Sequence, residues 1–348
     1  MCTRNPLPGS LSAPAPGVGR PPRKDWKWLA HATRRAAILA MVSGLVILSC
    51  RNPSAAAFGT INWLGQHAVH ERMTRWALAD AGIGPATLGA LAGAPGSFGA
   101  VGAPDKPGRG LLGTKAAHCD GGDYLLTPGY PQTQEAAQFR LEACRAWIFS
   151  NLARAVEDAA GLAKSDPRST SLGCDFDGHR RGSAKCLVLE DLGLAFHAAQ
   201  DFYAHTNWVD RPAPGRTTVD DPPGLDNDRP APWIDPRRNV TFPAGLISGC
   251  YDGFPERRHC GAGGLNPRVA HHTLNKDRGV IDVSARTIGQ GETPRGRINE
   301  NFQRAAAAAI ADTRDKWAYL EEQLVATYGA ERTTEIACLL RSDLASSC

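Results

Sequence analysis

The chain has 348 residues, ten cysteines and a formal net charge of +4. Eight basic residues but only one acidic residue fall in the first 57 positions, so the remainder carries 31 basic and 34 acidic residues. A net charge of about −3 on that remainder argues against the basic surface with which proteins bind nucleic-acid phosphates. The composition therefore excludes a strongly basic nucleic-acid-binding protein, and about 290 residues suit one domain with a sizeable core.

Residues 1–57 have the pattern of an export leader. Arg34 and Arg35 precede an apolar run over 36–49, and several small residues follow it. A run of about 14 apolar residues is shorter than a membrane span and typical of a signal sequence. We therefore expect a secreted, extracellular protein, and the paired arginines favour the twin-arginine route. Lipid attachment at Cys50 is the second hypothesis.

Eight cysteines lie outside this leader. An even number in an exported chain indicates disulfide bonds rather than thiolate metal sites. Connectivity does not follow from sequence alone, but short loops are the easiest to close, so we expect each cysteine to pair with the next one. The expected bridges are Cys119–Cys144, Cys174–Cys186, Cys250–Cys260 and Cys338–Cys348.

The first half of the expected domain, residues 58–348, alternates helical patterns with irregular segments. Apolar residues at helical spacing predict an amphipathic helix over 63–80. Residues 82–113 are rich in Gly, Ala and Pro, so we expect an irregular loop there. A longer helix is predicted over 133–164, and the Asp-Pro pair that follows ends it.

The second half contains the longest helical patterns. Helices are predicted over 187–210 and 298–328, with Gly329 as the stop of the latter, and a short final helix over 331–342. Residues 211–267 are rich in Pro, Gly and Asp, and long segments of this kind often shape a substrate entrance. Because no strand pattern is evident, the sequence predicts an all-α multi-helix bundle with long Pro/Gly-rich loops.

The predicted central helix carries His197, Asp201 and His205 at intervals of four residues. Since an α-helix advances about 100° per residue, all three side chains project from one face. A carboxylate between two buried imidazoles is costly to desolvate unless a cation compensates for it. Hydrogen-bonded core residues are the alternative, but three in this register favour a metal site. The first predicted helix adds His67 and His70, and either could be a further ligand.

Two other segments offer the same types of side chain. His118, Asp120 and Asp123 lie on a Gly-containing turn, where an aspartate could also act as a local cap. His271 and Asp277 follow the long loop region, where a histidine is often merely exposed. Histidine and carboxylate ligands without cysteine suit a catalytic zinc site, and more than four ligands imply more than one ion. Clustered zinc ions favour hydrolysis of a phosphoester.

These segments resemble a known family. The motif HAAQDFYAHTNW at 197–208 resembles the signature of the Het-C and CinY-like proteins, which are similar to the zinc-dependent phospholipase C and S1/P1 nuclease superfamily. Supporting segments are HERMT at His70, HCDGGDY at His118 and HHTLNKD at His271. Together they cover roughly residues 60–330.

The resemblance implies a helical fold that holds two or three zinc ions between its helices. It gives Asp201 the role of a bridging ligand and makes Asp277 a weaker partner of His271. Position 275 is Asn, where the enzymes of this superfamily carry a carboxylate. The implied metal ligands are His70, His118, Asp120, Asp123, His197, Asp201, His205 and His271.

The residues and the resemblance together predict an exported zinc-dependent phosphodiester hydrolase of the phospholipase C type. We expect a zinc-bound hydroxide to attack phosphorus, with Asp120 or Asp123 as general base. Phospholipid head groups at a membrane surface are expected in preference to nucleic acid, because an acidic chain does not attract a polyanion. A single-strand nuclease, which would stack bases on aromatic side chains, is one alternative. A non-catalytic, metal-stabilised secreted protein of the recognition or toxin type is the other.

Overall fold

The structure is a computed structural model, and it describes residues 67–211, 217–251, 260 and 267–348. All of these residues belong to one compact unit. The leader expected over residues 1–57, Cys50 included, lies outside the described residues, as does the start of the first expected helix.

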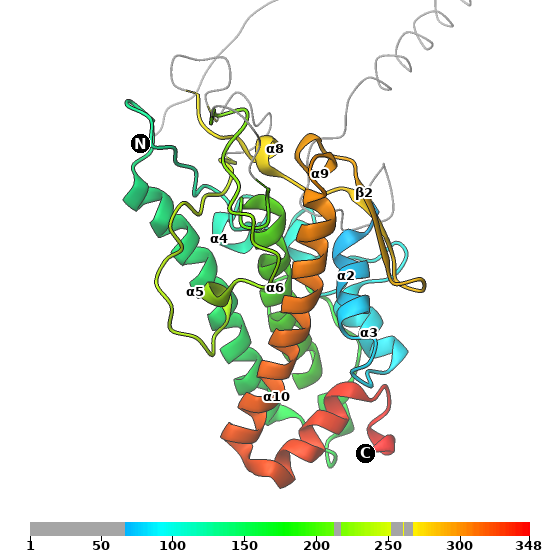
Figure 1. Cartoon of the computed structure of the whole chain (residues 1–348). Helices are drawn as coiled ribbons and strands as arrows, with labels where there is room; N and C mark the ends of the chain where they lie inside the picture. The colour runs from blue at the N-terminus through cyan, green and yellow to red at the C-terminus, as the bar shows by residue number, and fades with distance from the viewer. Residues whose placement is uncertain (1–66, 212–216, 252–259, 261–266) are drawn as a thin grey trace, which may run out of the picture. The chain divides into compact units, whose positions relative to one another are not determined.

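Three long helices form the body of the unit. Helix α6 (Ala184–His205) packs against both α5 (Gln134–Asp158) and α10 (Asn301–Arg341) (Figure 1). The hydroxyl of Ser183 caps α6 by accepting a hydrogen bond from the Cys186 amide. Every side chain of α6 from position 188 to 205 is buried, because neighbours cover the helix on all sides. Polar residues of α6 therefore lie in the interior of the protein.

The long helices follow the sequence pattern closely. Thr133 caps α5, but the helix ends at Asp158, before the predicted end at 164, and gives way to a 3₁₀ turn. Helix α6 likewise ends at His205, before the predicted end at 210. In α10, Gly329 has φ 76° and ψ 165°, which divides the element into two helical segments. The stop predicted at Gly329 and the separate helix predicted over 331–342 are thus confirmed.

Short elements pack around the three long helices. Helix α2 (Val69–Ala77) contacts α10 and α3 (Pro85–Ala92). The expectation of an irregular loop over 82–113 is wrong where α3 forms, because Pro85 at its first turn is pre-set for helical φ. The remaining short helices are α4 (Lys115–His118), α8 (His271–Leu274) and α9 (Pro294–Arg297), with 3₁₀ turns at Ala103–Asp105, Ala159–Gly161, Pro167–Thr170, Pro232–Ile234 and Ala345–Ser347.

One antiparallel hairpin corrects the prediction of a purely α-helical fold. Strand β1 (Gly279–Asp282) pairs with β2 (Thr287–Gly291), and Ile281 lies opposite Ile288. Four residues that alternate between buried and exposed are too short a pattern to identify a strand from sequence. The fold is mostly helical with this small sheet at its side (Figure 1).

Four disulfide bonds confirm the expected pairing of neighbouring cysteines: Cys119–Cys144, Cys174–Cys186, Cys250–Cys260 and Cys338–Cys348. Such bonds fit an oxidising, extracellular environment. Within the part of the chain that the structure describes, every helix is too short or too polar to cross a membrane.

Candidate metal centre

Helix α6 supplies the middle of the site. His197, Asp201 and His205 follow one another at intervals of about one turn and are buried, as their spacing predicts. The Asp201 carboxylate faces two imidazoles of its own helix and two from other elements, those of His70 on α2 and His118 on α4. The central helix thus gathers side chains that are far apart in the sequence.

The two oxygens of Asp201 face different pairs of histidines. Its Oδ2 lies 3.0 Å from His118 Nδ1 and 3.0 Å from His197 Nε2. Its Oδ1 lies 3.3 Å from His70 Nε2 and 3.8 Å from His205 Nε2. A carboxylate with nitrogen donors on both sides has the geometry of a bridge between two metal positions.

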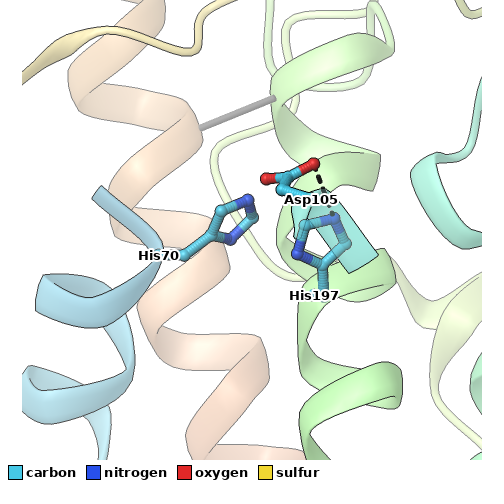
Figure 2. Close-up of side chains that lie close together, drawn as sticks. All are labelled: His70, Asp105 and His197. Carbon is cyan, nitrogen blue, oxygen red and sulfur yellow. Dashed lines mark ion pairs between the residues drawn. The ribbon is translucent and has the colours of Figure 1, made fainter. Parts of the chain in front are cut away.

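Gly193 brings a loop onto α6 next to this carboxylate. A Cβ atom at Gly193 would overlap the main chain of Ala100, so only glycine permits this close approach. The loop then places the Val101 carbonyl 2.9 Å from His197 Nδ1 and Asp105 Oδ1 3.9 Å from His197 Nε2. Figure 2 shows the result, in which His70 and His197 from two helices lie beside the Asp105 carboxylate.

His205 connects the centre to a second set of residues. Its Nδ1 lies 3.3 Å from Asp120 Oδ1, and its Nε2 lies 3.1 Å from Asp277 Oδ1. The other oxygen of Asp277 lies 3.8 Å from His271 Nε2. Gly249 packs directly on the main chain of His271, where a Cβ atom would overlap it. Asp277, expected as a weaker partner of His271, therefore lies within the cluster.

Three neighbouring groups among the described residues could each hold a metal ion, because the donor atoms within each group lie within 4.8 Å of one another. The first two groups share His197, and Asp201 of the second faces His205 of the third. The groups are His70, Asp105 and His197; His118, His197 and Asp201; and Asp120, His205 and His271.

Hydrogen-bond polarity identifies the nitrogen that each α6 histidine directs into the centre. The Nδ1 atoms of His197 and His205 lie 2.9 and 2.8 Å from the carbonyl oxygens of Val101 and His118. A carbonyl only accepts, so each Nδ1 carries a proton and each neutral ring has its lone pair at Nε2. The lone pair of His197 faces Asp201 Oδ2 at 3.0 Å. Two acceptors at this distance repel each other unless a proton or a metal cation lies between them.

The separations fit metal coordination. Zinc bonds of about 2.0–2.1 Å in a tetrahedral arrangement place two ligand atoms about 3.3 Å apart. The histidine nitrogens nearest to Asp201 lie 3.0–3.3 Å from its oxygens. Among the described residues, none donates a hydrogen bond to Asp201 Oδ1, Asp120 Oδ1 or Asp277 Oδ2. A cation would provide the partner that buried carboxylate oxygens require.

The carboxylates make His118 favour its protonated form. Burial lowers the pKa of His118, but the hydrogen bond to Asp201 and the charges of Asp105, Asp201 and Asp120 raise it to about 9. A raised imidazole pKa means that the surrounding potential is negative. Protons and metal cations therefore compete for the same position.

The neighbouring groups respond to the same charges. Burial lowers the pKa of His70, but Asp201 and other carboxylates outweigh it, so that this pKa is raised. The pKa of His205 is affected in the same way and lies well above its ordinary value. For His197 burial prevails, and its pKa is lowered. Burial would raise the pKa of Asp201, but the charges of His197 and His205 hold it well below the ordinary value. The central carboxylate is therefore ionised and available to a cation.

Asp123 lies outside the three groups. Its carboxylate accepts hydrogen bonds from Arg268 at 2.6 and 2.8 Å and from the Tyr130 hydroxyl at 2.7 Å. The side-chain amide of Gln132 donates to its main-chain carbonyl at 3.0 Å. Asp123 thus connects the turn that bears Asp120 to the segment before α8, and the structure does not bring it together with the other expected ligands.

The structure also distinguishes the two histidines of the first helix. His67 is partly exposed, and its Nε2 lies 2.7 Å from a carboxylate oxygen of Glu292. His70 is buried beside Asp201, and its ring stacks on that of His197 with centroids 4.3 Å apart. His70 is therefore the member of this pair that belongs to the centre.

Asp105 is the candidate ligand that sequence reasoning missed. It lies in a segment rich in Gly, Ala and Pro, with no helical period to show which way the side chain points. One signal was available, since Asp105 is the first charged residue after Asp80. A lone carboxylate in a long uncharged segment that becomes buried needs a compensating partner.

Comparison with known proteins supplies no template for this centre. No known protein family, curated protein or solved structure matches the chain. The site is therefore defined by the contacts of its own residues.

Proposed function

We propose that this chain is an exported, zinc-dependent hydrolase of phosphodiesters of the phospholipase C type. The observation that carries this proposal is the buried Asp201 carboxylate, whose two oxygens face four imidazoles. Nitrogen and oxygen donors without thiolates suit catalytic rather than structural zinc. The three neighbouring groups support two or three ions. The resemblance of the α6 motif to Het-C and CinY-like proteins supports the same class of reaction.

The residues at the edge of the cluster indicate where substrate would approach. Asp105, His118 and Asp120 are 4–7% exposed, whereas His70, His197, Asp201, His205, His271 and Asp277 are at most 2% exposed. Bound zinc would lower the pKa of a water molecule and neutralise the charge that grows on the phosphoryl oxygens. Asp120 is the better placed general base, because its Oδ1 accepts no hydrogen bond from the described residues while Asp123 is held by Arg268.

A cavity that begins after the turn bearing Asp120 supports a substrate with an apolar part. It has a volume of about 1090 Å³, and its wall begins at Tyr124, directly after the turn that bears Asp120. Much of the wall is apolar, with Leu125, Leu246 and Ile247 among its residues, and none of the candidate ligands lines it. An apolar cavity in a phosphodiester-cleaving protein favours a phospholipid over a nucleic acid as substrate.

Burial favours a second candidate function. No candidate ligand of the three groups is more than 7% exposed, so the described residues leave little room for a large substrate at the metal. A secreted protein in which metal ions stabilise the fold, and which acts by binding a partner, would need no such access.

The test compares two isosteric substitutions on α6. Asp201→Asn removes the charge at the centre, whereas Asp191→Asn makes the same change in a buried aspartate that pairs with Arg154 and Arg180. We expect the wild-type chain and Asp191→Asn to bind zinc and to cleave a phospholipid emulsion, and Asp201→Asn to lose both properties.

Other results of the zinc-binding and cleavage assays would point to a different function. Zinc binding by the wild type without cleavage of phospholipid, single-stranded DNA or a simple phosphodiester would favour the binding protein. Cleavage of single-stranded DNA alone would favour the nuclease. Full zinc content in Asp201→Asn would refute the metal centre itself.

A further inference from the structure

His70 directs one nitrogen towards the centre, and a side-chain amide determines which nitrogen that is. His70 Nε2 lies 3.3 Å from Asp201 Oδ1, and His70 Nδ1 lies 2.7 Å from Gln200 Oε1. The α6 histidines face main-chain carbonyls, which only accept hydrogen bonds. An amide can donate or accept, depending on which of its two ends faces the ring. The tautomer of His70 therefore depends on the orientation of Gln200.

Thr313 on α10 sets that orientation. Its hydroxyl donates its single proton to the carbonyl of Ala309 at 2.8 Å. Towards Gln200, 3.1 Å away, the Thr313 oxygen can then only accept, so the end of the amide that faces it must be the NH₂ group. The same NH₂ group donates to Thr74 at 3.0 Å. The oxygen of Gln200 consequently faces His70 and accepts the proton of Nδ1.

We infer that Gln200 and Thr313 are positioning residues that fix His70 as the Nδ1–H tautomer, with its Nε2 lone pair directed at a metal ion shared with Asp201. This inference rests on the proposed metal centre. Groups that hold the far nitrogen of a metal-binding histidine orient the ring and tune its affinity for the metal. Here the hydrogen-bond chain runs from α10 through α6 to α2, so the three helices must be assembled before the ligand atom is defined.

Because these side chains are buried, water cannot replace their hydrogen bonds, and the orientation of the Gln200 amide is fixed. The side chains of His70, Gln200 and Thr313 are completely buried, as is that of Thr74. If the amide were reversed, its NH₂ group would face Nδ1 and its oxygen would face two hydroxyl oxygens, one of which has already donated its proton to Ala309. The reversed amide would place the His70 proton on Nε2, where it would block the metal.

The first experiment observes the tautomer directly. The full chain, with its disulfides intact and ¹⁵N-labelled histidine, is stripped of metal and brought to a pH at which the His70 ring is neutral. A long-range ¹H–¹⁵N spectrum then reports which nitrogen carries the proton, and the His70 signals are identified by their loss in His70→Asn. We expect Nδ1–H in the wild type and a shift towards Nε2–H in Gln200→Leu. Nε2–H in the wild type would overturn the inference.

The second experiment measures zinc binding, with zinc alone as the probe. We expect Gln200→Leu to weaken the binding of one ion by about 10- to 100-fold and to leave the other ions unchanged. Gln200→Glu, which still accepts from Nδ1, should largely restore that affinity. Thr313→Val should have a smaller effect, because Thr74 still accepts from the amide. Wild-type affinity in Gln200→Leu, or an equal loss for every ion, would contradict the inference.

A control variant, and substitutions that remain useful if one variant does not fold, complete the test. Thr333→Val makes the same isosteric change in another buried threonine of α10, whose hydroxyl has no hydrogen-bond partner among the described residues, and it should bind zinc normally. If Gln200→Leu does not fold, Gln200→Glu and Thr313→Val still provide the comparison. Failure of the wild type to bind zinc would refute the proposed hydrolase, while the tautomer of the metal-free chain would still decide the role of Gln200.

Discussion

The Nδ1 atom of His118 lies 3.0 Å from Oδ2 of Asp201, although 83 positions separate the two residues in the sequence. Cys119, the residue after His118, has a left-handed φ of 55° and forms a disulfide with Cys144 of α5. The bond therefore anchors the turn between two candidate ligands, His118 and Asp120. Metal binding and disulfide formation should be coupled at this turn.

Removal of that disulfide should release metal as well as stability. We expect the double variant Cys119→Ser and Cys144→Ser to lose about 2–5 kcal/mol of stability and to bind fewer zinc ions than the wild type. Removal of the Cys338–Cys348 bond, which closes the C-terminal end of the chain, should lower stability but leave the zinc content unchanged. Chemical denaturation and elemental analysis measure the two effects. Equal zinc content in both variants would show that the turn does not need its anchor.

Opposite pH dependences are expected with and without metal. The folded-state pKa of His118, about 9, lies above its ordinary value of 6.5. The stabilisation from its proton is therefore complete below pH 6.5 and is lost as the pH rises through 9. Zinc requires the neutral ring, so its affinity should rise over the same range.

Thermal unfolding of the metal-free and the zinc-loaded chain between pH 6 and pH 10 tests this prediction. His118→Asn cannot titrate and should show a flatter profile without metal. A metal-free wild type whose stability is constant or increases over this range would contradict the negative potential that we infer at the centre.

Gly193→Ala should disturb the centre from one helical turn away. Its Cβ would overlap Ala100 and push the loop that carries Asp105 away from His197. We expect a loss of about 1–3 kcal/mol in stability together with weaker zinc binding. Gly89→Ala in α3 is the matched control, because a Cβ there meets nothing within 4 Å. It should stabilise the protein by up to about 1 kcal/mol, and zinc titration should distinguish the two variants.

The two aspartates of the predicted turn should behave differently. Asp123→Asn weakens a partly buried ion pair with Arg268, so we expect a loss of about 1.5–3 kcal/mol with zinc retained. Asp120→Asn should instead reduce zinc binding and phosphodiester hydrolysis, because Asp120 belongs to the third group of candidate ligands, with His205 and His271. The measurements are urea unfolding and zinc stoichiometry. Loss of zinc in Asp123→Asn alone would reverse the two roles.

Much of the fold follows from local patterns in the sequence. The four-residue spacing of His197, Asp201 and His205 places them on one helix face whatever surrounds the helix, because the periodicity is a property of the backbone. Gly329 interrupts its helix for a similarly local reason, since glycine adopts positive φ without a steric penalty. Sequential disulfide pairing follows from the low entropic cost of closing short loops.

Short elements were less predictable. Helix α3 and the hairpin of β1 and β2 have eight, four and five residues, which is too few for a periodic signal. Segments of this length depend on tertiary contacts for stability, and α3 and β1 both pack on α2. The sequence therefore identified the long helices and misassigned short elements that depend on their neighbours.

The membership of the site was decided by tertiary structure. Asp105 ends a 3₁₀ turn and Asp123 lies in an irregular segment, yet Asp105 joins the candidate metal centre and Asp123 pairs with Arg268. Asp105 reaches the centre because Gly193 lets the main chain at Ala100 approach α6, whereas Asp123 meets Arg268 from a distant part of the sequence. In the arrangement that we infer, the nitrogen of His70 that is directed at the centre likewise depends on Gln200 and, through it, on α10. By itself the sequence determined the long helices and the spacing of the candidate ligands along α6, because both follow from backbone geometry. The partner of each polar side chain was decided by the tertiary structure, because it lies on a distant segment that meets α6 only in the folded chain.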